Sequence, residues 1–151
     1  MKMHLLIIML LFGIVSPGNA QVNAKKEIEE VSSFNLLNKS YISGKINDTV
    51  YMVKIDSLTN RLLNEGVYFD INEMAQHLEL YNKIAWSGKE YGSYREIYYM
   101  ILLNNAYMQD MRGATIYYAE KANAEGRKNG NPRTFIEMAV KIKYLFFTRK
   151  A

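Results

Sequence analysis

Two stretches of the chain repeat each other at a spacing of 38 residues, and this repeat limits the possible folds more than any other feature. Segment 88–95 (GKEYGSYR) aligns with segment 126–133 (GRKNGNPR), so both glycines, a residue able to begin a helix and the final arginine recur. The same offset places Met100 on Met138. A repeat of this length is typical of an α-solenoid, in which each two-helix unit packs mainly on its neighbours.

Apolar residues elsewhere recur at helical spacing, between residues that begin and end helices. Asn47, Asp70, Ser93 and Asn131 each precede such a stretch and carry side chains that cap helix N-termini. Ser93 also has Glu96 three residues later, which is the spacing of a capping box. With only 2 prolines and 9 glycines, turn-rich β structure is disfavoured. The sequence predicts an all-α chain with helices at about 24–43, 49–65, 71–85, 93–108, 113–127 and from Pro132 onward.

The first twenty residues have the order of a secretory signal. Lys2 precedes an apolar run from Leu5 to Val15, and a small-residue pattern ending at Ala20 follows. The run makes a helix of about 16 Å, too short to cross roughly 30 Å of hydrocarbon. We therefore predict a signal peptide over 1–20, cleavage after Ala20, and a periplasmic or secreted bacterial chain whose mature part has no stable membrane span.

The segment around Ala106-Tyr107 resembles a tetratricopeptide repeat. Leu103 and Ala106-Tyr107 match the family's first helix, and the run from Tyr117 to Ala122 (YYAEKA) matches its second. Asn104 departs from the family, which prefers a small residue there. The resemblance implies a short right-handed solenoid of stacked antiparallel helix hairpins, similar to periplasmic segments of bacterial sensor and regulatory proteins. It divides the mature chain into an N-terminal helix at 21–48, a divergent repeat at 49–92, the best match at 93–130 and half a repeat at 131–151.

The resemblance also implies a place for a ligand, because the first helix of each repeat lines the concave face in this family. Alignment on Ala106-Tyr107 assigns Tyr98, Ile101, Asn105 and Met108 to that face. Adding 38 residues to Asn105 gives Lys143, so the two side chains would be neighbours. We interpret them as a donor pair for a carboxylate of a protein or peptide partner. Solvation of Lys143 at the surface is the alternative interpretation.

Residues that carry chemistry are scarce. The mature part holds one histidine, His77, which lies within a predicted helix and has no recognisable nucleophile or orienting group. There is no cysteine, so thiolate metal sites are excluded. The net charge of +4 falls to +3 without residues 1–20, which is too weak and too evenly spread to predict a nucleic-acid partner. We expect no enzyme, no cofactor and no metal site.

Two groups of surface residues keep alternative interpretations. The many tyrosines between Tyr91 and Tyr118 can form a sugar- or peptide-binding platform, or pack against the small residues Ala119 and Ala122. Thr49 and Ser57 each follow an aspartate and precede an apolar residue, which is similar to an acceptor motif for O-linked glycans on exported proteins of some anaerobic bacteria. Helix capping at Thr49 is the simpler explanation.

The last predicted helix is apolar on nearly all sides. One neighbouring hairpin covers only a stripe of such a helix. We therefore expect Tyr144, Phe146 and Phe147 to form a contact surface, for a second copy or for a helix in sequence not present here. The function favoured is an exported, non-enzymatic scaffold that binds a protein or peptide. The alternatives are the N-terminal sensory segment of a membrane-bound regulator and, ranked last, a glycan-capture helper.

Overall fold

The structure is a computed structural model that describes residues 17–147, and these residues form helices and turns without any strand. The all-α prediction is therefore confirmed. Residues 1–16, which hold most of the predicted signal peptide, lie outside the described part, as does the side chain of Phe146. The helices are α2 (Pro17–Ile42), α3 (Asp48–Asn64), α4 (Ile71–His77), α5 (Glu79–Ala85), the 3-10 helix η1 (Lys89–Tyr91), α6 (Gly92–Met108), α7 (Arg112–Lys128) and α8 (Pro132–Phe147).

The chain divides into two units, one ending at Ser33 and the other beginning at Phe34, so α2 crosses the boundary. In the first unit, the described residues 17–33 form one continuous helical stretch. This stretch includes Ala20, and cleavage at that residue stays a prediction. Among the described residues, no helix is both long enough and apolar enough to span a membrane. The rest of the structure belongs to the second unit.

Most of the predicted helix starts are confirmed. The side chains of Asn47, Asp70 and Asn131 each accept a hydrogen bond of 2.9–3.1 Å from a backbone N–H in the first turn of the helix that follows. The capping box at Ser93 is wrong, because α6 begins one residue earlier and Glu96 turns towards other partners. Local capping signals therefore locate the helices but do not identify what Glu96 does.

Two glycines end helices as the sequence predicts. Gly44 follows α2 and Gly66 follows α3, and both have a φ of 72°, in the left-handed region that side chains with a Cβ rarely occupy. The backbone N–H of Gly66 donates to the carbonyl of Leu63 and that of Val67 to the carbonyl of Leu62. These bonds satisfy carbonyls at the end of α3.

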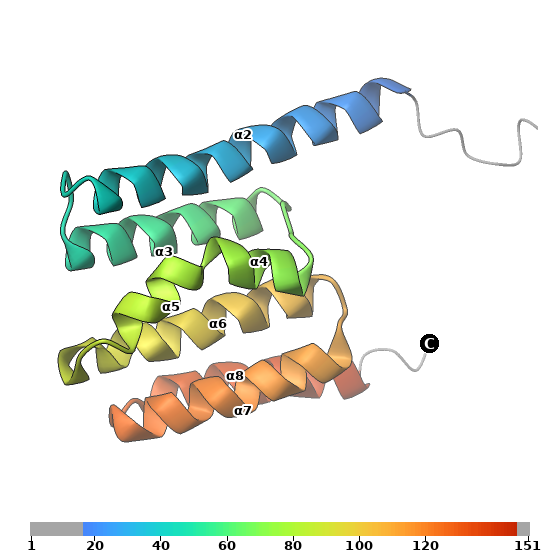
Figure 1. The fold of residues 1–151 in the computed structure, drawn as a ribbon. Coiled ribbons are helices and arrows are strands. Elements are labelled where there is room, and N and C mark those ends of the chain that lie inside the picture. The colour runs from blue at the N-terminus through green and yellow to red at the C-terminus, as the bar shows by residue number, and fades with distance from the viewer. Residues whose placement is uncertain (1–16, 148–151) are drawn as a thin grey trace, which may run out of the picture. The chain divides into compact units, whose positions relative to one another are not determined.

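The helix predicted over 71–85 is broken in two at Leu78. The backbone of Leu78 has a φ of −93° and a ψ of 6°, and its side chain is fully buried. Figure 1 shows α4 and α5 meeting at an angle at this point, and both pack on α6. A single straight helix could not follow α6 in this way, so tertiary packing overrides the uninterrupted helical pattern of the sequence.

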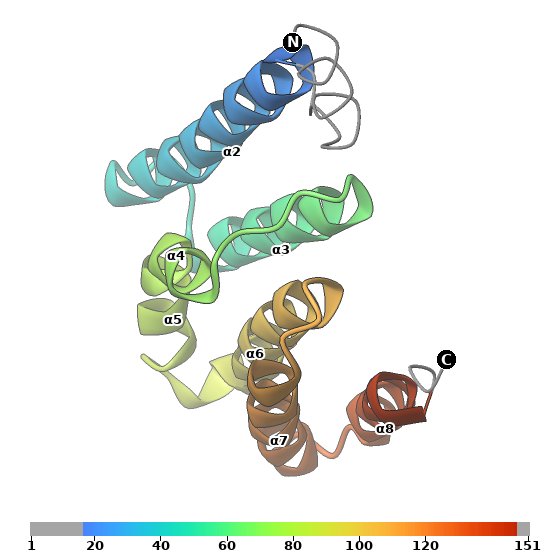
Figure 2. The same cartoon turned by 90° about the vertical axis from the view of Figure 1, so that its right-hand side faces the viewer.

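Helix α6 lies at the centre of the second unit. It packs on α3, α4 and α5 on one side and forms an antiparallel hairpin with α7 on the other, while α8 follows against α7 (Figures 1 and 2). The seam between α6, α7 and α8 is built from Leu103, Ala119, Ala122 and Met138, all buried. Small alanines let two helices approach closely, as the sequence predicts for α7.

A buried amide fixes the loop between α3 and α4 to α6. The Asn105 side chain is fully buried, and its Oδ1 accepts from the backbone N–H of Phe69 at 3.1 Å while its Nδ2 donates to the Phe69 carbonyl at 2.8 Å. Gln109 Nε2 donates to the same carbonyl at 2.8 Å. The loop belongs to no helix or sheet that could pair the backbone groups of Phe69. The side chains of Asn105 and Gln109 therefore supply the hydrogen-bond partners that these buried groups need.

Replacing Asn105 by alanine should lower the free energy of unfolding by about 2–4 kcal/mol, because both backbone groups of Phe69 lose a buried partner. Asn104→Ala, at the partly buried neighbouring position, is the matched control and should cost about 1 kcal/mol or less. Urea unfolding followed by circular dichroism measures both. Equal losses in the two variants would contradict the role given to the Asn105 amide.

Candidate functional site

The structure corrects the predicted concave surface on α6. Tyr98, Ile101 and Asn105 are buried, with 9%, 4% and 0% of their surfaces exposed, and only Met108 at the helix end is half exposed. Tyr98 packs on Tyr81 of α5, and Asn105 pairs with the loop between α3 and α4. The groove beside α3 and α8 is lined on α6 by Ser93, Glu96, Ile97 and Met100, so the register predicted for that face is wrong. Tyr98 instead lines a different pocket, beside α5 and α7.

The predicted pairing of Asn105 with Lys143 is also absent. Asn105 is buried with its amide engaged by Phe69, whereas Lys143 is exposed on α8. The offset of 38 residues therefore equates a buried position with an exposed one. The repeat in the sequence marks the neighbourhood of both helix starts, but α6 begins at Gly92 and α8 at Pro132, and positions 38 residues apart do not share an environment.

The groove that the structure does form runs between α3, α6 and α8 and encloses about 540 Å³. Most of its lining residues are polar in type. Burial raises the pKa of the Asp56 carboxyl, while a hydrogen bond from Asn60 acts in the opposite direction. Its lining residues are Asp56, Asn60, Ser93, Glu96, Ile97, Met100, Asn131, Arg133, Thr134 and Glu137.

The floor of this groove contains the buried carboxylate of Glu96. It accepts hydrogen bonds from Asn131 Nδ2 at 2.8 Å, from Asn129 Nδ2 at 3.1 Å and from the hydroxyl of Thr134. A Cβ at Gly126 would stand 3.1 Å from Glu96 Oε1, so glycine permits the close approach of α7. Three neutral donors hold this carboxylate in place, so it joins the N-terminal part of α6 to the turn between α7 and α8 and to the start of α8.

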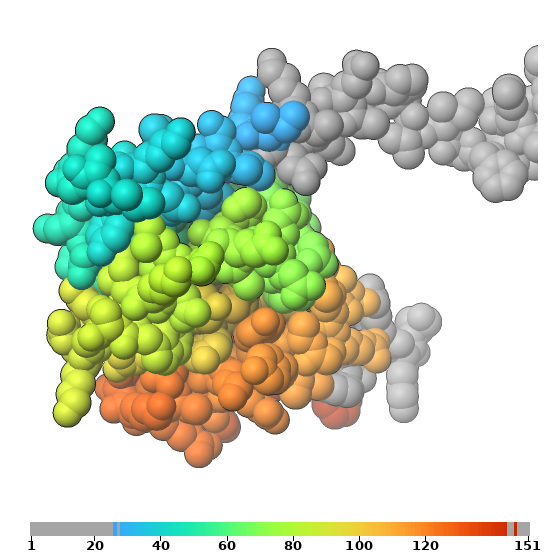
Figure 3. Space-filling model, viewed as in Figure 1, coloured from blue at the N-terminus to red at the C-terminus, as the bar shows by residue number. Residues whose placement is uncertain are grey.

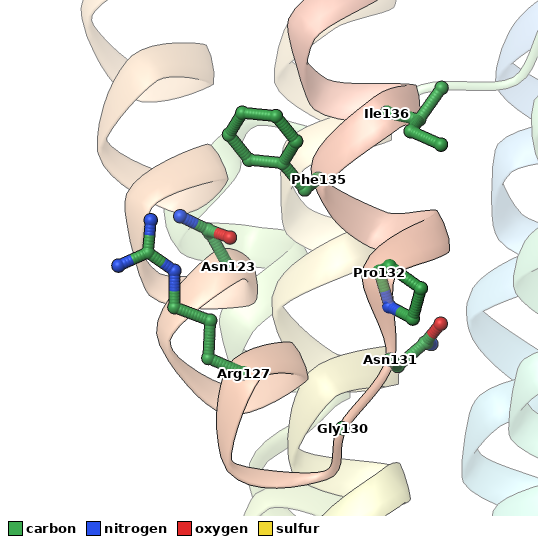
Figure 4. Close-up of a pocket in the computed structure, with 7 residues that line it drawn as sticks. All are labelled: Asn123, Arg127, Gly130, Asn131, Pro132, Phe135 and Ile136. Atoms are coloured by element: carbon green, nitrogen blue, oxygen red, sulfur yellow. The ribbon is translucent and has the colours of Figure 1, made fainter.

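A second opening lies between α7 and α8 and encloses about 680 Å³ (Figure 4). The ring of Phe135 lies between the two helices and faces Asn123 and the head group of Arg127. The lining is mainly apolar, with these two polar side chains on one wall, which is the usual make-up of a binding pocket. The lining residues are Asn123, Arg127, Gly130, Asn131, Pro132, Phe135 and Ile136.

This pocket lies beside the exposed apolar face of α8, defined here as Ile136, Val140, Tyr144 and Phe147, whose surfaces are between 57% and 75% exposed. Phe135, which is 54% exposed, points from another side of α8 towards α7 (Figure 4). The structure therefore brings together two of the three residues predicted as a contact surface, Tyr144 and Phe147. The Tyr144 ring also lies 6.3 Å from that of Tyr107 on α6.

Comparison with known proteins adds no functional assignment. No protein-family model matches the sequence, and neither the curated proteins nor the solved structures give a significant match.

His77 packs in an aromatic cluster. Its ring stacks on Phe34 with centroids 4.7 Å apart and meets the edge of Phe69 at 5.0 Å. Burial lowers the pKa of the imidazole, and the nearby Glu73 carboxylate partly opposes this shift. In the part of the chain that the structure describes, no group of three or more His, Asp or Glu side chains could hold a metal ion.

The two predicted glycan acceptors, Thr49 and Ser57, are both exposed on α3. The aspartate before Thr49 has another role, because the Asp48 carboxylate accepts hydrogen bonds from the hydroxyls of Tyr41 and Tyr91, each at 2.8 Å. Glycosylation at either position stays a prediction.

Thr134→Val keeps the shape of the side chain but removes one donor from the buried Glu96 carboxylate. We expect it to lower the free energy of unfolding by about 1–3 kcal/mol. Thr134→Ser keeps the hydroxyl and should cost clearly less. Urea unfolding of both variants measures the difference. If the serine variant were as unstable as the valine variant, the methyl group and not the hydrogen bond would be what matters.

Proposed function

We propose that this chain is an exported, non-enzymatic scaffold that binds a protein through the exposed apolar face of α8 and the adjoining α7–α8 pocket, and that the protein bound is a second copy of the chain. The observation that carries this proposal is the concentration of four large apolar side chains on one surface of α8, with Phe135 exposed beside the adjoining pocket. Patches of this kind on soluble proteins mark interaction sites when they exceed a few hundred Å².

The arrangement of these residues supports a helix-to-helix contact. Ile136, Val140 and Phe147 recur at helical spacing along one face of α8. The opposite face holds Thr134 and Met138, both buried against α6 and α7. Arg133 and Lys143 are charged residues on the open face, and the stem of each can lie along an apolar partner while its charged end reaches water.

The order of the helices supports a repeat-type scaffold. Helix α3 contacts α5 and α6, α6 forms a hairpin with α7, and α7 contacts α8, an order that is compatible with the predicted tetratricopeptide-like stacking. In such a stack, α8 is the first helix of a hairpin and needs a cover on its outer side. A second copy supplies that cover through the same face of its own α8, which is the self-complementary contact of a two-fold dimer.

The proposal of a non-enzymatic, exported protein rests on two further observations. The buried groups most suited to acid–base chemistry, Glu96 and His77, are engaged in hydrogen bonding and ring stacking. The sequence at 1–20 has the order of an export signal.

Sedimentation velocity tests the contact. At about 100 μM the protein should sediment as a dimer, and Val140→Glu should weaken association at least tenfold, because a charge would have to be desolvated at the centre of the contact. Val53→Glu, at a half-exposed valine on α3, is the matched control and should leave association unchanged. A monomeric protein at this concentration, or equal weakening by both variants, would contradict the proposed dimer.

A further inference from the structure

A row of aromatic rings lines a separate pocket across α5, α6 and α7. On the face shown in Figure 3, the light-green surface of α5, the yellow surface of α6 and the orange surface of α7 meet. The pocket encloses about 520 Å³, within the range of small-ligand and peptide sites. Its lining residues are Asn82, Lys83, Trp86, Tyr98, Tyr99, Tyr117 and Tyr118.

The rings contact one another in sequence from one helix to the next. Trp86 meets Tyr98 and Tyr99 edge-on, with centroids 5.5 and 5.6 Å apart. Tyr99 lies 6.5 Å from Tyr118, which in turn lies 5.1 Å from Tyr117. Such contacts hold each ring in one orientation, so the row is a preformed surface.

Packing explains only part of this row. Tyr98 is buried at its centre, but Trp86 and Tyr117 at its two ends are 43% and 52% exposed. Burial raises the pKa of Tyr98 to about 12 and also raises the pKa values of Tyr99 and Tyr118. These hydroxyls therefore remain protonated and keep their capacity to donate.

The polar groups of the pocket are rich in donors. Asn82 contributes an amide, Lys83 an ammonium, Trp86 an indole N–H and the tyrosines their hydroxyls, while none of the lining residues carries a carboxylate. Lys121 adds a positive charge beside the pocket, with its Nζ 5.4 Å from the centroid of the Tyr117 ring, whereas Lys83 pairs with the Glu79 carboxylate at 2.7 Å. The surface thus suits a ligand that offers acceptors and flat apolar groups but few donors of its own.

We propose that this pocket binds a proline-rich segment of a partner protein in the polyproline II conformation. Proline offers a carbonyl and no N–H, and its ring packs flat on aromatic side chains. A polyproline II helix has no internal hydrogen bonds, so its carbonyls are free for the donors of the pocket. Aromatic grooves recognise such segments because the helix is already formed before binding. This site is separate from α8 and does not depend on the proposed dimer.

The fluorescence of the protein offers a direct test, because Trp86 is the chain's single tryptophan. Titration of the purified protein with a ten-residue oligoproline should give a saturable change in Trp86 fluorescence. A glycine–serine peptide of equal length should give none. Tyr117→Ala should weaken binding at least tenfold, and Tyr117→Phe, which keeps the ring, should weaken it less. Val53→Ala, at a half-exposed apolar residue on α3 outside both proposed surfaces, is the control and should bind as the unchanged protein does.

Three outcomes would overturn the proposal. They are no saturable change with oligoproline up to millimolar concentration, an equal response to the glycine–serine peptide, or equal binding by the Tyr117→Ala variant. Saturation by a glucose hexasaccharide in place of oligoproline would assign the pocket to carbohydrate instead. Sedimentation velocity of the same samples measures their oligomeric state separately, so the result for this pocket can be distinguished from the result for the α8 contact.

Discussion

The rotation of α6 about its own axis decides which of its residues are buried and which reach the surface. Two buried polar groups fix that rotation. Near the end of the helix, the Asn105 amide pairs with the backbone of Phe69, and near its start the Glu96 carboxylate takes donors from the α7–α8 turn. Buried polar groups are costly unless their partners are in place. Turning the helix by one residue would break both sets of bonds.

This fixed orientation of α6 determines which side chains of the second unit are exposed in the two proposed binding surfaces. With Tyr98 facing α5, the neighbouring Tyr99 reaches the rings on α7 and completes the aromatic row. With Glu96 facing the α7–α8 turn, the start of α8 is held through Thr134, and the opposite side of α8 is left open. The two proposed binding surfaces therefore depend on the same helix, although they lie on different elements.

Local chemistry made much of the fold predictable. The caps at Asn47, Asp70 and Asn131, the helix-ending glycines and the small alanines of α7 act within a few residues, so one sequence reveals them. The break at Leu78 and the register of α6 escaped prediction because they follow from contacts between distant segments, such as that between Phe69 and Asn105. Glu96 was misread for the same reason, since its partners lie more than thirty residues along the chain. The position of Glu96 beside an apolar run indicated that its carboxylate has a structural role. It did not indicate which segment of the chain supplies the hydrogen-bond donors.

Hydrogen exchange of the backbone amides tests this account of α6 most directly. Helix ends normally fray and exchange faster than helix centres. If buried polar groups hold both ends of α6, the hydrogen-bonded amides of its first and last turns should exchange as slowly as those at its centre, at the rate set by global unfolding. Exchange at either end that is faster than at the centre by two or more orders of magnitude would show that the helix is not held at that end, and would contradict the account.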